Sequence, residues 1–301
     1  MLALWRLARP RGGAVLLLVP LLGYGIALWD HALDPVHLLA LVLVLSGWFV
    51  ASAGTMWLNA SLDGDEKEAL YARPTERPRG LPFFGYAAIT AGVALAFAGN
   101  RLSGACASGC AVLSLLYSHP ATMWKARPVL GPLVNAAGYG VLTSLAGWAI
   151  VGVPMSFRVA AAFASVTMFV VGATFAAQAF QREDDARRGY RTLVVTHGPA
   201  ACLRAARGCA WASVGIVLVL SALGFYPRIC LLGMPAFAQV DAWIRRWQRE
   251  PGAGTSSHAA GLVARMLGLG VVLLALAYVD YALDRAAGRP AAGLATARGR
   301  P

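Results

Sequence analysis

Acidic and basic side chains gather between Asn59 and Gly80, in a chain where only 13% of the residues are charged. The segment reads N-A-S-L-D-G-D-E-K-E-A-L-Y-A-R-P-T-E-R-P-R-G and lies between two long apolar runs. Asn59 and Asp63 are four residues apart, so they share one face if the preceding helix continues through them. Mg²⁺ takes oxygen ligands and is often held by one or two carboxylates together with substrate phosphates. The pattern favours a cradle for a metal ion and an anionic substrate, over a solvated loop with scattered ion pairs.

The rest of this segment extends the same chemistry. Asp65 and Glu68 add carboxylates beyond Asp63. Arg77 and Arg79 can neutralise phosphate oxygens, because a guanidinium offers paired N–H donors. We therefore treat Asp65 and Glu68 as further candidate metal ligands, and Arg77 as a candidate phosphate contact.

A second acidic cluster reads Q-R-E-D-D-A-R-R-G-Y-R-T-L-V-V-T-H-G over residues 181–198. Asp184 and Asp185 are adjacent and cannot both face the same way on a helix, whereas Gln181 and Asp185 at i and i+4 can. Gly189 and Thr192 indicate a break and a restart of structure. Arginines follow the acids here as they do in the first cluster, so the two loops can converge on one cation if they lie on the same side of a bundle.

A third stretch, Y-S-H-P-A-T-M-W-K-A-R-P over residues 117–128, places a lysine between an aromatic residue and an arginine. Lys125 can contact a phosphate as a point charge. The alternative is structural, because Tyr117 and Trp124 are ordinary interfacial aromatics and basic residues are common in cytoplasmic loops.

The elements that must position these loops are membrane helices. Hydrophobic residues make up 58% of the chain and the mean hydropathy is +0.60. Apolar segments long enough to span a bilayer as helices recur from end to end. We expect nine spans, at 13–29, 37–60, 82–99, 102–118, 130–151, 157–181, 208–225, 227–244 and 260–282. The first is preceded by three arginines, as in a signal peptide, but has no small-residue cleavage site and is expected to be retained.

The distribution of basic residues orients this bundle. With the N-terminus on side one, 18 of the 26 lysines and arginines fall on side one and 7 on side two, while Arg265 lies inside the last span. The positive-inside rule makes side one cytoplasmic and puts all three charged loops there. The net charge of +12 is spread over these loops instead of forming one stripe, which excludes a nucleic-acid footprint.

The remaining features carry no separate domain or cofactor. The five cysteines and five histidines show no metal-ligand spacing, and the cysteines are expected to be buried apolar residues. We expect a single transmembrane domain over residues 1–284, followed by a disordered, basic tail over 285–301.

Together the three stretches resemble the UbiA superfamily of intramembrane prenyltransferases. Members carry N-D-x-x-D-x-x-x-D after helix two, and Asn59 and Asp63 match its Asn and the Asp four residues on. R-P-R-G at 77–80 and Y-S-H-P with W-K and P at 117–128 resemble two further family segments, and L-A-R-P at 7–10 is typical. The second motif, D-x-x-x-D-x-x-x-G-x-x-T over 178–198, is matched by Asp185, Gly189 and Thr192. Lys67 and Gln181 stand where the family has Asp, so this site is less anionic.

The resemblance implies a nine-helix, all-α integral membrane bundle in the bacterial inner membrane, with cytoplasmic active-site loops. It implies Mg²⁺-assisted transfer of an isoprenyl group from an isoprenyl diphosphate to an aromatic or other lipophilic acceptor. The implied metal ligands are Asn59, Asp63, Asp65, Glu68, Gln181, Asp184 and Asp185. The implied diphosphate contacts are Arg77, Tyr117, Lys125 and Arg191, and the catalytic set is Asn59, Asp63, Lys125 and Asp185.

Three tyrosines and three glycines complete the implied site. Tyr117, Tyr139 and Tyr190 are candidates to orient substrate or to stabilise a cation. Gly138, Gly140 and Gly147 allow close helix approach, for packing or to shape the prenyl chamber. A UbiA-type terpene cyclase is the first alternative. A non-catalytic or transport homologue is the second, disfavoured because Arg265 is the chief ionisable residue well inside the expected spans.

Overall fold

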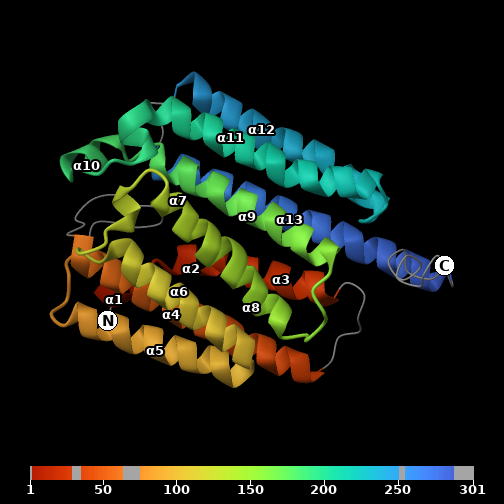
Figure 1. Cartoon of the computed structure of the whole chain (residues 1–301), viewed down its shortest axis with the longest axis horizontal. Coiled ribbons are helices and arrows are strands. Elements are labelled where there is room, and N and C mark those ends of the chain that lie inside the picture. Colours follow the sequence, from red (N-terminus) through yellow and green to blue (C-terminus); the bar gives the residue numbers. More distant parts are fainter. Residues whose placement is uncertain (1, 29–34, 64–74, 251–254, 288–301) are drawn as a thin grey trace.

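The computed structural model describes residues 2–28, 35–63, 75–250 and 255–287, and these form helices joined by short loops (Figure 1). The N-terminal half contains α1 (Leu2–Leu7), α2 (Pro10–Leu16), α3 (Leu18–Leu28), α4 (Pro35–Asp63), α5 (Leu81–Gly99), α6 (Arg101–Ser118), η1 (Trp124–Ala126), α7 (Leu130–Asn135), the π-helix η2 (Ala136–Leu142) and α8 (Thr143–Ala149). The C-terminal half contains α9 (Phe157–Gln178), α10 (Arg182–Arg187), α11 (Leu193–Ala222), η3 (Arg228–Gly233), α12 (Met234–Arg249) and α13 (Ser256–Ala286).

Six stretches of helix are long and apolar enough to cross a membrane. They are Pro10–Leu28, His37–Leu62, Leu81–Gly99, Phe157–Gln178, Leu193–Ala222 and Ser256–Asp284. They agree with the first, second, third, sixth, seventh and ninth expected spans, so an all-α membrane bundle is confirmed. The other three expected spans fall on α6, on the run from α7 to α8, and on α12. The count of nine spans stays a prediction.

The expected boundaries were wrong in two places. The seventh span was expected to begin at residue 208, but α11 begins at Leu193 and is bent at Gly198, where φ is +79° and Pro199 follows. The eighth was expected over 227–244, but a 3₁₀ turn occupies 228–233 and α12 continues to Arg249. Both errors place more polar residues inside helices than the sequence pattern indicated. Hydropathy sums over a window miss a helix whose polar residues all fall on one face.

The core is divided between the two halves of the chain. In the C-terminal half, α9, α11, α12 and α13 bury a cluster that includes Leu203, Phe237, Ile244 and Leu262. In the N-terminal half, residues of α3, α4, α5, α6 and α8 bury a second cluster. Figure 1 shows these halves as two groups of roughly parallel helices. A third, smaller cluster joins the halves, because Val19 and Leu22 of α3 pack against Val263 and Leu267 of α13.

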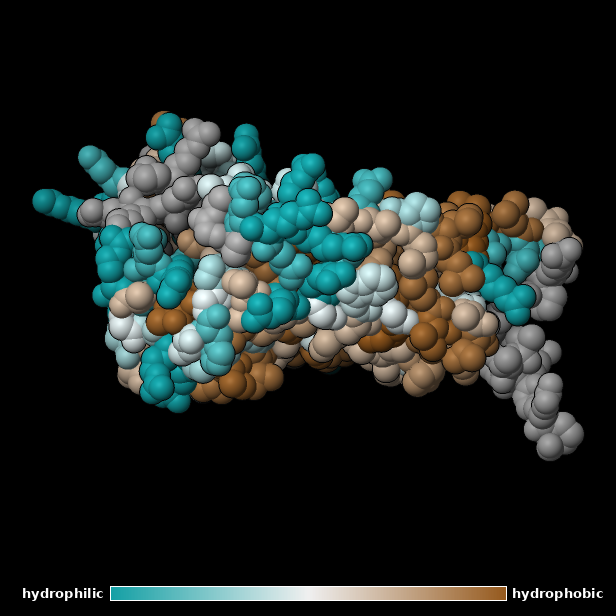
Figure 2. Space-filling model, turned by 90° about the horizontal axis from the view of Figure 1, so that it is seen from above, coloured by the Kyte–Doolittle hydropathy of each residue, from teal (hydrophilic) through white to brown (hydrophobic). Residues whose placement is uncertain are grey.

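Polar residues collect at one end of the bundle. In Figure 1, α1, α10 and the start of α7 lie at the same end, whereas α13 finishes at the other. Figure 2 shows hydrophilic residues concentrated at the α10 end and hydrophobic residues at the opposite end. Charge is excluded from the hydrocarbon region, so the end that carries the charged loops must lie outside it.

Glycines allow close contacts between α3 and α8 and between η2 and α9. A Cβ added at Gly147 on α8 would lie 1.8 Å from the carbonyl oxygen of Pro20 on α3, and one at Gly23 would lie 2.0 Å from that of Ser144. Gly140 likewise faces Thr167 of α9, at 2.8 Å from Oγ1. Gly138 is different, since its nearest neighbour is 3.8 Å away. Two of the three glycines singled out in the sequence therefore serve close packing.

We predict that Gly147→Ala lowers the thermal stability of the purified protein, by about 3 kcal/mol in unfolding free energy, because a methyl group must separate α3 from α8. Gly208→Ala on α11 is the matched control, since nothing lies within 4 Å of a Cβ there. The control should be neutral or slightly stabilising, because alanine favours the helix. Equal melting temperatures for both variants, measured in detergent, would contradict this packing account.

Candidate active site

The second acidic motif folds into a turn that returns onto its own aspartate. The N–H of Asp185 donates to the carbonyl of Gln181, so Gln181 caps the start of α10. The two residues are therefore one helical turn apart, as their i, i+4 spacing predicted. Gly189 adopts a φ of +72°, a conformation that a residue with a side chain rarely takes. The chain reverses, and the hydroxyl of Thr192 donates to Oδ2 of Asp185 at 2.7 Å. The Asp, Gly and Thr of the motif are thus parts of one hydrogen-bonded turn.

Asp185 is held in a buried and electropositive position. Its exposed fraction is 9%. Burial raises the pKa of Asp185 above its usual range, against the Thr192 hydrogen bond and the charges of Arg188 and Lys125, which lower it. A carboxylate in this state gains most from a cation that binds beside it, because the cation replaces the hydration that burial removed.

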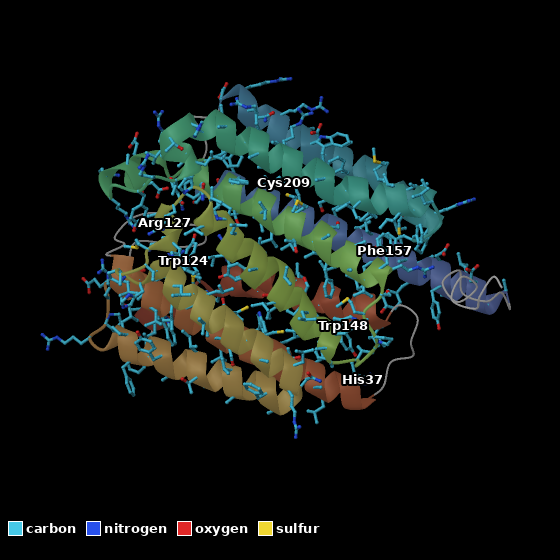
Figure 3. The ribbon with its side chains drawn as sticks, viewed as in Figure 1. His37, Trp124, Arg127, Trp148, Phe157 and Cys209 are labelled. Carbon is cyan, nitrogen blue, oxygen red and sulfur yellow. The ribbon has the colours of Figure 1, made fainter. Side chains whose placement is uncertain are left out.

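Backbone and ring contacts join this turn to the basic loop that follows α6. The N–H of Arg191 donates to the carbonyl of Ala126 at 2.8 Å. Lys125 Nζ and Arg188 Cζ each lie 5.9 Å from the ring centroid of Tyr190. Figure 3 shows Trp124 and Arg127, the residues around Lys125, at the same end of the bundle as α10. The tertiary structure therefore brings together two stretches that are some sixty residues apart in sequence.

A chamber of two connected cavities opens beneath these loops. One cavity, of about 270 Å³, lies among α2, α4, α9 and α13. The other, of about 240 Å³, lies among α4, α6, α7 and η2. Both are lined by Ser52, Tyr117, Asn135 and Tyr139, so they are two lobes of one space. Their combined size falls in the range of small-molecule sites.

The polar lining of the chamber is concentrated at the end that carries the loops. Asn59, in the last turn of α4, lines one lobe. Arg9, Gln178 and Gln181 line the other. Gln178 is 7% exposed, and its Oε1 has no hydrogen-bond partner. A buried amide oxygen without a partner is costly, so this atom is available to a ligand that binds in the chamber.

The first motif is only partly described. The helix does continue through it, because α4 runs to Asp63 and so puts Asn59 and Asp63 one turn apart on the same face. The side chain of Asp63, and the whole of Asp65, Glu68 and Lys67, lie outside the described residues. Arg77 is described and its side chain is exposed.

The remaining candidate side chains differ in whether they face the chamber or the outer surface. Asp184 is half-buried and forms an ion pair with Arg187 on the outer side of the helix, away from the buried Asp185. Arg191 joins the loops through its backbone, while its side chain is exposed. Tyr117 and Tyr139 line the chamber, whereas Tyr190 lies between the two loops above it.

Two chamber residues were missed in the sequence. Arg9 follows a helix end and has a φ of +50°, which turns α2 toward the chamber. Its signal was the L-A-R-P segment at 7–10, noted only as typical. Gln178 stood three residues before Gln181 and carried no charge to mark it. Only the burial of its side chain, which a sequence does not display, distinguishes it from an ordinary polar residue at a helix end.

The donor atoms present fit a hard cation. Within the described part of the chain, no three His, Cys, Asp or Glu side chains gather closely enough to hold a metal by themselves. However, the carboxylate of Asp185 and the amide oxygens of Asn59, Gln178 and Gln181 are all oxygen ligands of the kind that Mg²⁺ takes. Gln178 Oε1 is the strongest indication, because it is buried and has no partner.

The fold and site define a helical membrane protein with a chamber under charged loops. Comparison with known proteins gives the family: residues 16–259 match the UbiA prenyltransferase family, and the chain belongs to it. A UbiA homologue from Archaeoglobus fulgidus, solved with DMAPP and Mg²⁺, is 17% identical, with a TM-score of 0.62 over 90% of this chain and 99% of that one.

Other solved structures share the fold. An apo UbiA homologue from Aeropyrum pernix K1 is 17% identical, with a TM-score of 0.63 over 89% of this chain and 98% of that one. A digeranylgeranylglyceryl phosphate synthase is 17% identical, with a TM-score of 0.62 over 92% and 96% of the two chains. No curated protein matches the sequence significantly. At these identities the likeness supports the fold.

We predict that Thr192→Val weakens Mn²⁺ binding most at low pH. Removing the hydroxyl removes a hydrogen bond that lowers the pKa of Asp185, so the carboxyl stays protonated to a higher pH and protons compete better with the metal. The loss should be about tenfold near pH 6 and smaller near pH 8, measured by electron paramagnetic resonance of free Mn²⁺. Thr196→Val is the control, because the hydroxyl of Thr196 donates to the backbone carbonyls of Thr192 and Leu193 and not to a carboxylate. A loss independent of pH would contradict the account.

Proposed function

We propose that this protein transfers an isoprenyl group from an isoprenyl diphosphate to an aromatic or other lipophilic acceptor within the membrane. The observation that carries the proposal is the chamber, which has Asn59, Gln178 and Gln181 at its loop end and a mostly apolar lining beyond them. One lobe lies between the two halves of the bundle and the other lies within the N-terminal half. An isoprenyl diphosphate has the matching form, an anionic head on an apolar chain. Membership of the UbiA prenyltransferase family supports the same chemistry.

The diphosphate head is assigned to the loop end of the chamber. Lys125 supplies a compact positive charge there, and its charge already acts on Asp185. Arg77 and Arg191 have exposed side chains that can turn toward phosphate oxygens. Tyr117 lines both lobes and can orient the first carbons of the chain.

The cation is assigned to oxygen ligands from both acidic motifs. We propose Asn59, Asp63 and Asp185 as its main ligands, with Asp65, Glu68 and Gln181 as further candidates. Gln178 joins them because its buried Oε1 has no partner, whereas Asp184 is the weakest candidate because it pairs with Arg187 on the outer side of α10. Mg²⁺ held there would neutralise the charge that develops on the departing diphosphate. This agrees with a family homologue solved with GPP and Mg²⁺. Because amide oxygens bring no charge, the site is less anionic than two full aspartate motifs would make it.

The chain's own residues then handle the cleavage. The bond between C1 of the isoprenyl group and the diphosphate oxygen breaks, and its electron pair leaves with the diphosphate. Fixed positive charge from Lys125 and Arg77 stabilises that leaving group. The allylic cation remains in the chamber, where the rings of Tyr117 and Tyr139 can stabilise it. An electron pair of the acceptor forms the new bond to C1, and the acceptor then loses a proton.

The apolar interior protects this cation from water. The lobe that extends from Asn59 has a mostly apolar lining that includes Leu113, Val134 and Ile89, although Ser114, Asn135 and Thr143 also line it. The apolar part of this lining limits the water that can lie beside the cation. A bundle of apolar helices of this kind acts as an integral membrane protein. We propose the bacterial inner membrane, with the active-site loops in the cytoplasm, from the distribution of basic residues.

We predict that Asp185→Asn lowers prenyl transfer by about a hundredfold, because the neutral side chain no longer attracts the cation that activates the diphosphate. The assay is mass spectrometry of lipid products formed from geranyl, farnesyl and geranylgeranyl diphosphates with an aromatic acceptor, with Mg²⁺ or with a chelator. Wild-type product should disappear with the chelator.

Glu183→Gln is the matched control, since Glu183 is exposed on the same short helix. It should retain wild-type turnover. Full activity of Asp185→Asn would contradict the metal-assisted reaction. A cyclic hydrocarbon formed without acceptor would instead identify a terpene cyclase, and no product under any condition would favour the non-catalytic alternative.

The far wall of the chamber generates a prediction about chain length. Trp48 lines the lobe that begins at Asn59, and its Nε1 lies 3.4 Å from Oγ1 of Thr143 on α8. Trp48 and Asn59 are eleven positions apart on α4, or about 16 Å along the helix. Trp48→Ala should shift the preferred substrate toward longer diphosphates, measured as the ratio of products in competition. Trp5→Ala, at an exposed position, should leave the ratio unchanged.

A further inference from the structure

Four arginines follow the outer seam between α11 and α12, away from the candidate active site. Arg204 and Arg207 are three residues apart on α11, and Arg245 and Arg249 are four apart on α12, so each pair shares a face of its helix. Arg204 and Arg249 are exposed, and the side chains of Arg207 and Arg245 are 36% and 57% exposed. Figure 2, which looks onto these helices, shows hydrophilic residues extending from the charged end toward the middle of the face. We call these four residues the arginine seam.

A single buried carboxylate fixes the middle of the arginine seam. Asp241 is 2% exposed, and it accepts hydrogen bonds from Arg207 Nε at 2.7 Å and from Trp211 Nε1 at 3.0 Å. Arg245 also forms an ion pair with Asp241. One carboxylate shared by two guanidinium groups leaves a net positive charge, and its oxygens are fully engaged. Asp241 therefore holds the centre of the arginine seam in place, and the surface of the seam carries a net positive charge.

The outer members of the seam lack a similar partner. Within the described residues, neither Arg204 nor Arg249 forms an ion pair with a carboxylate, and Glu250, just past α12, is exposed. Exposed arginines on a membrane helix are stable only where they reach the headgroup region. An acceptor from outside the chain is therefore expected at this surface.

The position of the seam along α11 agrees with the headgroup level. Beyond its bend at Gly198, α11 continues for 24 residues from Pro199 to Ala222, or about 36 Å, whereas the hydrocarbon core is about 30 Å thick. The helix must leave the hydrocarbon core within its length, and its apolar run lies toward Ala222. Trp211, Val219 and Leu223 are exposed on that side. The same surface thus presents guanidinium groups toward the loop end and apolar side chains toward the opposite end.

We propose that the arginine seam binds an anionic phospholipid of the leaflet that faces the candidate active site. The headgroup phosphate accepts paired N–H donors from Arg204, Arg245 and Arg249. The acyl chains lie along the exposed apolar residues further down α11. Basic pockets between membrane helices on the cytoplasmic side are known to suit such headgroups. This site requires only that the bundle spans a membrane, so it is independent of the proposed reaction.

Lipid binding to purified protein tests the proposal. The full chain in detergent is titrated with phosphatidylglycerol or with phosphatidylcholine of the same acyl chains, and bound lipid is counted by native mass spectrometry. The wild type should retain phosphatidylglycerol in preference. Arg204→Gln with Arg249→Gln should reduce that preference by about fivefold for each arginine. These two residues are chosen because their replacement leaves the Asp241 ion pairs intact.

Arg101→Gln with Arg228→Gln is the matched control, since both residues are exposed and lie outside the arginine seam. The control should keep the wild-type preference, and all three proteins should melt alike. The proposal is overturned if the wild type binds both lipids equally, or if the control loses the preference as fully as the seam variant. It is also overturned if the seam proves to be buried in a dimer that excludes lipid.

Discussion

The hydrocarbon core of a bilayer excludes charge, so the charged residues of this chain must lie at the ends of the bundle or at the level of the lipid headgroups. The arrangement of the molecule depends on that constraint. Helices satisfy their own backbone hydrogen bonds, so they can cross the hydrocarbon region without further partners. The polar loops must then lie outside the hydrocarbon region, and in this protein hydrophilic residues are concentrated at one end of the bundle. In this protein the turn after α9 and the loop after α6 meet through the Arg191 to Ala126 hydrogen bond and the ring of Tyr190. Proximity of the acidic and basic groups follows from the exclusion of both from lipid.

The second requirement is that the bundle be closely packed and yet hollow. Gly23 and Gly147 let the backbones of α3 and α8 touch, which anchors one side of the chamber. Two buried clusters stabilise the separate halves, and a smaller one joins α3 to α9 and α13. One lobe of the chamber lies where the halves meet. A cavity in an apolar interior costs packing energy, so its persistence between two well-packed halves is consistent with a ligand that fills it.

The departures from the family motif alter the charge of the site more than its shape. Gln181 still accepts the hydrogen bond that begins α10, so the turn that presents Asp185 is kept. Gln178 contributes a buried oxygen one turn earlier on the chamber wall. Replacing carboxylates by amides lowers the attraction for a divalent cation, and the nearby Lys125 lowers it further. A substrate that brings its own negative charge would restore the balance, which is the situation in a diphosphate complex.

The sequence by itself determined the class of fold, the membrane setting and the family. Long apolar runs must form helices in lipid, because a helix satisfies its own backbone hydrogen bonds. The spacing of Asp185, Gly189 and Thr192 encodes a local turn that needs no distant contact. The tertiary structure decided what depends on packing between distant segments. It brought Arg9 and Gln178 to the chamber, joined residues 126 and 191, and buried Asp185 while leaving Asp184 on the outer side of α10. It also placed Asp241 in mid-helix against Arg207, whereas the sequence pattern put Asp241 near the end of the eighth expected span. Such pairings depend on which helices become neighbours, and a hydropathy pattern carries no information about that choice.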